Sequence, residues 1–199
     1  MSRNHYLRTQ ERYYSPHHRL FQISQIALEN AVDSAEGREL NVVTAITFSA
    51  LGVEAFCNAL GYRVVTDWLS FEDLATGQKI EALSKSLDVP FSATSKPWET
   101  LLWLIGFRNE IVHGKPEHLK TQKVLSEIAL EKTRLHIPKS KLENQLTVGN
   151  AKRAVQSTKD MYEIFRLATS MNVGFEIFQD GWSGSVTALV DGNGPEGSR

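Results

Sequence analysis

Apolar residues along most of this chain recur at intervals of three and four positions, the spacing of one face of an α-helix. Leu20, Ile23 and Ala27 follow this spacing in the first such stretch. The next stretch is apolar nearly all round, which predicts a central, buried helix. The predicted helices span about residues 16–35, 40–60, 71–87, 98–113, 116–133 and 148–171.

This pattern predicts an all-α protein, a bundle of five or six helices. No stretch before residue 172 alternates convincingly with a period of two, and no internal repeat is visible. After residue 172 the pattern is compatible with a short hairpin around Asp180-Gly181 or with an irregular, glycine-rich tail. We therefore expect a basic segment with an amphipathic helix (1–38), a helical core (39–172) and a C-terminal tail (173–199).

Composition places this chain among globular proteins. It has 199 residues, of which 41% are hydrophobic, enough for a substantial core. The single cysteine, Cys57, excludes an internal disulfide and favours a reducing compartment, so we expect a cytoplasmic protein. The N-terminus has no apolar run typical of a secretory signal. Residues 42–60 approach membrane-spanning length but contain Glu54 and Asn58, which favours a buried helix over a membrane span.

The formal net charge of −1 predicts no global attraction to polyanions, so any nucleic-acid site must be local. Two basic groups are candidates, although solvated surface charge is the commoner explanation for each. The first contains Arg3, Arg8, Arg12 and Arg19 interleaved with Tyr6, Tyr13 and Tyr14, and the second contains Lys139, Lys141, Lys152 and Arg153.

Candidate chemistry is concentrated at the end of the helix predicted over residues 98–113. Gly114 followed by Pro116 is a stop signal that places His113 in the last turn. Arg108 supplies a planar set of donors for phosphate oxygens, and the His113 imidazole can relay a proton. These residue types suit phosphodiester cleavage without a metal ion.

The helical spacing arranges these side chains. Asn109 and His113 are four residues apart and share a face, whereas Arg108 points about 140° away from His113 and must bend back toward it. Glu54 is the only charged residue between Asn41 and Tyr62, so we expect it to face a partner. Arg108 is the expected partner, which Glu54 would orient.

With Arg108-Asn109, three further residues and then His113-Gly114, the chain resembles the HEPN superfamily, whose members often carry R-x4-6-H at a helix end. The resemblance covers roughly residues 40–171 and extends to the preceding apolar helix with its lone Glu54. It implies a metal-independent ribonuclease without a cofactor, in which two copies of the motif meet in a symmetric homodimer. It assigns proton transfer to His113, stabilisation of phosphoryl charge to Arg108 and positioning of the phosphate to Asn109.

One departure from that superfamily changes the expectation. HEPN toxins paired with nucleotidyltransferase antitoxins typically carry a tyrosine two residues after the histidine, where this chain has Lys115. Regulation by adenylylation is therefore not implied, and Lys115 is a candidate for substrate binding. A toxin with an antitoxin or other protein partner, a phage-defence nuclease and an RNA-processing enzyme all remain open.

Two other interpretations also remain open: a non-catalytic HEPN-like module that binds RNA or protein, and a plain helical scaffold. A metal hydrolase is disfavoured because His113 and His118 are separated by Gly114 and Pro116, which leaves no HExxH spacing. Cys57 lies in an apolar helix, which disfavours a thiol nucleophile. No GxSxG elbow or phosphate-binding glycine loop occurs.

Overall fold

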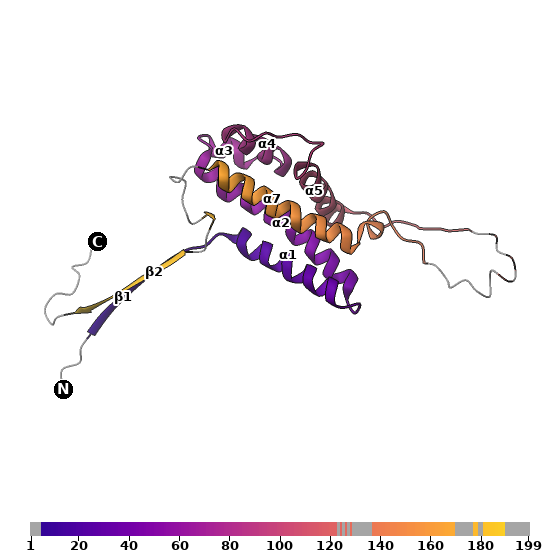
Figure 1. Ribbon diagram of the computed structural model, residues 1–199, viewed down its shortest axis with the longest axis horizontal. Coiled ribbons are helices and arrows are strands. Elements are labelled where there is room, and N and C mark those ends of the chain that lie inside the picture. Colours follow the sequence, from indigo (N-terminus) through magenta and orange to yellow (C-terminus); the bar gives the residue numbers. More distant parts are fainter. Residues whose placement is uncertain are drawn as a thin grey trace.

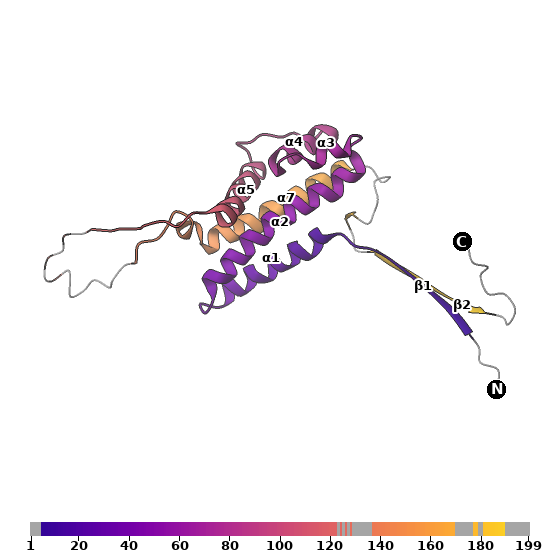
Figure 2. The same ribbon diagram turned by 180° about the vertical axis from the view of Figure 1, so that it is seen from behind.

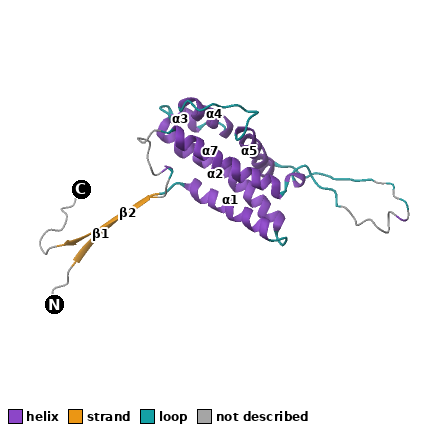
Figure 3. Ribbon diagram, in the orientation of Figure 1, coloured by secondary structure: helices purple, strands orange, loops and turns teal. Residues whose placement is uncertain are grey.

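The computed structural model describes residues 5–122, 124, 126, 128, 137–169, 177–178 and 181–189. Six α-helices and one two-stranded sheet occur in this part of the chain, which confirms the predicted all-α bundle (Figure 3). In chain order the elements are β1 (His5–Tyr13), α1 (Pro16–Asp33), α2 (Arg38–Val64), α3 (Trp68–Glu72), α4 (Thr76–Ser86), α5 (Trp98–His113), the 3-10 helix η1 (Glu143–Gln145), α7 (Val148–Ala168) and β2 (Gly181–Leu189).

The central helix of the bundle is α2, which packs against α1, α4, α5 and α7 (Figures 1 and 2). Small residues allow the close approach: a Cβ atom added to Gly52 would lie 2.5 Å from the Phe21 ring on α1. By length and composition α2 is the one described helix that could cross a membrane. Its packing on four other helices instead fits the buried core helix expected from the sequence.

The amphipathic helix α1 belongs to the same core as α2 and α7. The hydroxyl of Ser24, a buried residue on α1, donates to the carbonyl oxygen of Ala45 at 2.9 Å. It also lies 2.6 Å from the hydroxyl of Ser49. Because both contacts are on α2, two buried hydroxyls gain partners across the helix pair. The helix expected within residues 1–38 is thus part of the bundle.

The single helix predicted over residues 71–87 is wrong, because two helices occupy this region. The Asp67 carboxylate accepts from the Ser70 N–H at 3.3 Å at the start of α3. The Gln78 side chain accepts from the Ala75 N–H at 3.1 Å at the start of α4. Each new helix therefore has its own hydrogen-bonded start, and the chain turns between Glu72 and Thr76.

A second correction concerns the helix predicted over residues 116–133. Residues 114–122 carry no helical structure, and most of residues 123–133 lie outside the described part of the chain. The described residues after Gly114 are exposed, so no buried face supports a helix there. The last predicted helix ends at Ala168, and Met171 lies outside the described residues.

The C-terminal hairpin is also wrong, because β2 pairs with β1 at the other end of the chain. The two strands run antiparallel from His5 opposite Leu189 to Tyr13 opposite Gly181. Together they form a ribbon that projects from the bundle (Figures 1 and 2). The strand β1 was not predicted, because Arg8, Gln10 and Arg12 alternate with no apolar face typical of a buried strand.

Candidate functional site

The motif helix α5 begins and ends at the residues predicted from the sequence, Trp98 and His113. Its buried side carries Leu101 and Leu104, which are fully buried against the bundle. Arg108 continues that line at a spacing of three and four residues, so it faces inward rather than toward solvent. The end of α5 lies at the end of the bundle opposite the ribbon (Figures 1 and 2).

Arg108 meets Glu54, as the sequence indicated. A guanidinium nitrogen of Arg108 donates to a carboxylate oxygen of Glu54, and the two side chains form an ion pair between α5 and α2. The Arg108 side chain is 23% exposed and the Glu54 side chain 34% exposed. The pair is therefore accessible from solvent, and Glu54 restricts where the guanidinium can point.

Asn109 and His113 lie on a different side of α5, where both are exposed. Gly106 is exposed on the same stripe, and a Cβ atom added to it would have no neighbour within 4 Å. Lys115 follows in the exposed segment after the helix. Within one chain, Arg108 is thus held toward α2 while the imidazole and amide face solvent.

Gly114 ends α5 for a different reason from the one expected. Its φ of −57° is an ordinary value for any residue, so it does not form a left-handed cap. However, a Cβ atom at this position would lie 2.6 Å from the carbonyl oxygen of Glu110. The absence of a side chain therefore allows the chain to leave the helix directly after His113.

Sequence reasoning missed a polar network on the other flank of α5. The Trp103 indole N–H donates to the side-chain oxygen of Gln145 at 2.8 Å. The Gln145 amide nitrogen donates to the Glu110 carboxylate at 3.2 Å. The Arg153 guanidinium carbon lies 4.4 Å from the Trp103 ring centroid. Trp103 and Glu110, seven residues apart on one face, were the only local signal, because their partner Gln145 is remote in sequence.

Other reactive groups offer less. Burial raises the pKa of the Cys57 thiol to about 12, although nearby Lys79 opposes the shift. The thiol is therefore neutral at physiological pH and is a poor nucleophile. No group of three or more His, Cys, Asp or Glu side chains that could hold a metal ion occurs among the described residues.

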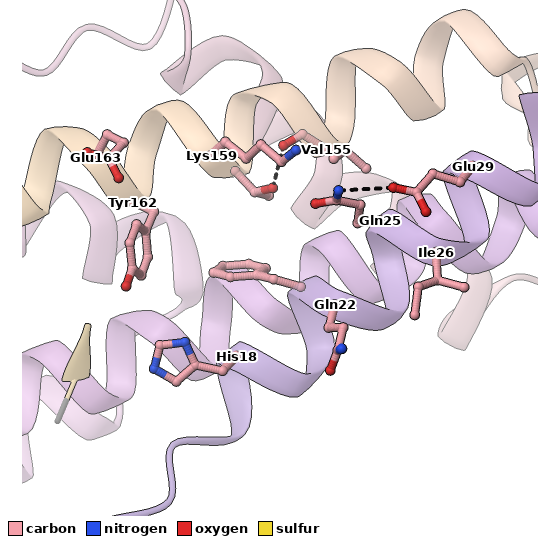
Figure 4. A pocket seen from close by; sticks show the side chains of 11 residues that line it. His18, Gln22, Gln25, Ile26, Glu29, Val155, Lys159, Tyr162 and Glu163 are labelled. Atoms are coloured by element: carbon pink, nitrogen blue, oxygen red, sulfur yellow. Dashed lines mark hydrogen bonds between the residues drawn. The ribbon is translucent and has the colours of Figure 1, made fainter. Parts of the chain in front are cut away.

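A cavity of about 580 Å³ lies between α1 and α7, away from the motif (Figure 4). Phe21 and Tyr162 line it together with His18, and the Gln25 amide donates to the Glu29 carboxylate at 3.0 Å across its rim (Figure 4). None of the motif residues lines this cavity. The motif is thus a surface site at a helix end.

Comparison with known proteins finds no matching family model, no matching curated protein and no matching solved structure.

Proposed function

We propose that this protein is a metal-independent endoribonuclease whose active site is built on Arg108, Asn109 and His113. The observation that carries the proposal is the Glu54–Arg108 ion pair, because it places an oriented guanidinium beside the helix end that presents the exposed His113. Asn109 shares the stripe of His113, and Lys115 adds a second cation within two residues. The resemblance to the HEPN superfamily supports the same assignment.

In the proposed reaction the ribose 2′-hydroxyl of RNA attacks the adjacent phosphorus. His113 carries the proton that the hydroxyl loses, and the P–O5′ bond breaks. The 5′-oxygen leaves as a hydroxyl after it gains a proton, and the other fragment ends in a 2′,3′-cyclic phosphate. Arg108 stabilises the charge on the phosphoryl oxygens, and Asn109 holds the phosphate. DNA lacks the attacking hydroxyl and is not cleaved.

The proposed active unit is a homodimer. Within one chain Arg108 faces α2, whereas His113 lies about 140° around the helix and faces solvent. A second copy of α5 packed against the exposed stripe would bring two sets of these side chains around one phosphate. Val112, which is 61% exposed beside His113, is an apolar residue suited to that contact.

We place this enzyme in the cytoplasm, as a toxin or phage-defence nuclease that an antitoxin or other protein partner controls. The single, buried Cys57 is compatible with a reducing compartment. The substrate is cellular RNA, and no membrane is involved in the proposed activity.

Cleavage of single-stranded RNA by the purified protein in EDTA tests the proposal. We expect products with 2′,3′-cyclic phosphate ends, and a loss of at least about 100-fold in rate for His113→Ala and Arg108→Ala. His118→Ala removes another exposed histidine, and Arg166→Ala breaks the exposed pair with Glu163, so both controls should cleave like wild type.

Equal cleavage by wild type and both motif variants, or cleavage by none of them, contradicts the nuclease. RNA binding that Arg108→Ala abolishes and His113→Ala leaves intact, without cleavage, would instead favour a binding module. Light scattering tests the composite site separately, because a strict monomer at micromolar concentration contradicts it.

A further inference from the structure

A second cavity, of about 440 Å³, lies where the ribbon joins the bundle. Its wall contains aromatic rings from three parts of the chain: Tyr14 before α1, Tyr62 on α2 and Trp68 on α3. The Tyr62 and Trp68 rings meet edge to face, with centroids 5.5 Å apart at 88°. Tyr62 is 63% exposed and Tyr14 58% exposed, so ring faces remain accessible to a ligand.

The cavity is electropositive. Arg63 lines it and places its guanidinium carbon 5.8 Å from the Tyr62 ring centroid. Behind the wall, the buried Lys79 ammonium donates to the Asn58 side-chain oxygen at 2.8 Å. No Asp or Glu is among the lining residues that the structure describes. An aromatic cage for a quaternary ammonium ion is disfavoured, because Arg63 would repel that ligand.

The ribbon extends this surface. Strand alternation places Tyr6, Arg8 and Arg12 on one face of β1, and the register sets Trp182 opposite Arg12 on the same face. Trp182 is 76% exposed. The only carboxylate of β1, Glu11, lies on the other face. The Arg12 guanidinium carbon lies 5.2 Å from the Tyr14 ring centroid, which joins the basic face of the ribbon to the cavity.

The cavity also lies near the motif along α2. Asn58 follows Glu54 by four residues and Tyr62 follows Asn58 by four, so the three share a ridge of the helix. Tyr62 is about 12 Å from Glu54 along the axis, a distance that a few nucleotides of an extended strand can cover. A strand at Arg108 can therefore continue toward the cavity.

Exposed aromatic rings, interspersed arginines and no carboxylate fit single-stranded RNA. Bases stack on aromatic side chains while cations track the phosphates. Duplex RNA fits poorly, because its bases are already stacked and its major groove is too narrow for side chains to read. An isolated two-stranded ribbon is only marginally stable in water, which is consistent with a partner on this face.

We propose that the cavity bounded by Tyr14, Tyr62 and Trp68 binds a nucleobase of single-stranded RNA, and that Arg63, Arg12 and Arg8 hold the neighbouring phosphates. This inference rests on the proposed function for the identity of the polymer. It assigns to the cavity and the ribbon the role of a substrate-binding site beyond the reacting phosphate.

Fluorescence anisotropy with a short, labelled, 2′-O-methyl RNA of mixed sequence tests this site, because that strand binds but has no free hydroxyl for the reaction. We expect Tyr62→Ala to weaken binding about fivefold or more, the effect of losing one stacked base, and Tyr62→Phe to retain affinity. Arg12→Gln should weaken binding and flatten its salt dependence. Leu69→Ala and Lys85→Gln, which alter exposed residues that do not line the cavity, should bind like wild type.

Cleavage of unmodified RNA separates this inference from the proposed function. Tyr62→Ala should raise KM and leave kcat unchanged, whereas His113→Ala lowers kcat. If wild type binds the probe with this pattern but cleaves no RNA, the binding site stands and the nuclease proposal falls. If RNA is cleaved but Tyr62→Ala and Arg12→Gln bind the probe like wild type, the binding site alone is wrong. A change of oligomeric state in Arg12→Gln, measured by light scattering, would instead assign the ribbon face to contact between copies and overturn the inference.

Discussion

The Arg108 guanidinium donates a hydrogen bond to the Glu54 carboxylate, and this ion pair joins α5 to α2. Both side chains are partly exposed, so solvent screens the pair and its contribution to stability is small. Its consequence is geometric. Arg108 is held at the start of the last turn and a half of α5, beside Asn109 and before His113.

Replacement of Glu54 by glutamine should therefore affect activity more than stability. We expect Glu54→Gln to lower the free energy of unfolding by no more than about 1 kcal/mol. The rate of RNA cleavage should fall about 10- to 100-fold, because the guanidinium loses its orientation. Urea unfolding and cleavage kinetics measure the two effects. Glu163→Gln, which breaks the exposed pair with Arg166, is the matched control, and equal cleavage by both variants would remove Glu54 from the site.

Two glycine-to-alanine changes should shift stability in opposite directions. A Cβ atom at Gly61 would lie 2.2 Å from the buried Phe71 ring, so Gly61→Ala should lower the free energy of unfolding by about 1–3 kcal/mol. Gly106 is exposed and has no neighbour within 4 Å of an added Cβ atom, so Gly106→Ala should raise it by about 0.5–1 kcal/mol. Chemical denaturation checks both signs.

Gly106 also tests the proposed dimer. It lies on the stripe of Asn109 and His113, where a second copy would pack. A methyl group there should change the dissociation constant of the dimer while it stabilises the isolated chain. If light scattering over a dilution series gives the same dimer dissociation constant for Gly106→Ala and wild type, this stripe is not the contact.

Stability should fall at alkaline pH. Burial raises the pKa of Cys57 from 9.0 to about 12 and that of Tyr162 from 10.0 to about 12. Because each folded-state pKa lies above the unfolded value, the unfolded chain loses these protons first. The stabilisation is complete below pH 9 and is lost progressively as the pH rises toward 12.

Urea unfolding at a series of pH values measures this loss, which approaches about 1.4 kcal/mol per pH unit for each ionising group. Cys57→Ala should remove the part of the slope that begins near pH 9, and Tyr162→Phe the part that begins near pH 10. An unchanged slope in Cys57→Ala would show that the thiol ionises equally in both states.

The Trp103–Gln145–Glu110 network should stabilise the junction between η1 and the motif helix. Gln145→Ala leaves the Trp103 N–H without its acceptor, and we expect a loss of about 1 kcal/mol in the free energy of unfolding. Gln156→Ala is the control, because its side chain bonds only to Asp160 on the exposed face of α7. Thermal unfolding compares the two variants, and equal losses would mean that the network adds no stability.

The limits of α5 were predictable from sequence because a helix depends on residues three and four positions apart. The apolar residues from Trp98 to Phe107 and the Gly114-Lys115-Pro116 sequence determine where it begins and ends. The pairing of Glu54 with Arg108 was predictable for a similar reason. A lone carboxylate in an apolar helix requires a partner, and few cations were available.

The break between α3 and α4 and the partner of β2 were not predictable from these patterns. Both depend on contacts whose strength is set by distance in space. Trp182 meets Arg12 only because the two ends of the chain form one ribbon, and its alternation marks neither strand as buried.

The order of residues by itself thus determined the helical class, the position of the motif and the identity of its chemical groups, because each is encoded within a few turns of chain. Tertiary structure alone decided that Arg108 faces inward while His113 faces solvent, and that the basic N-terminus joins a C-terminal strand beside an aromatic cavity. Those relationships arise when remote segments compete to bury their apolar surfaces and to satisfy their polar groups together.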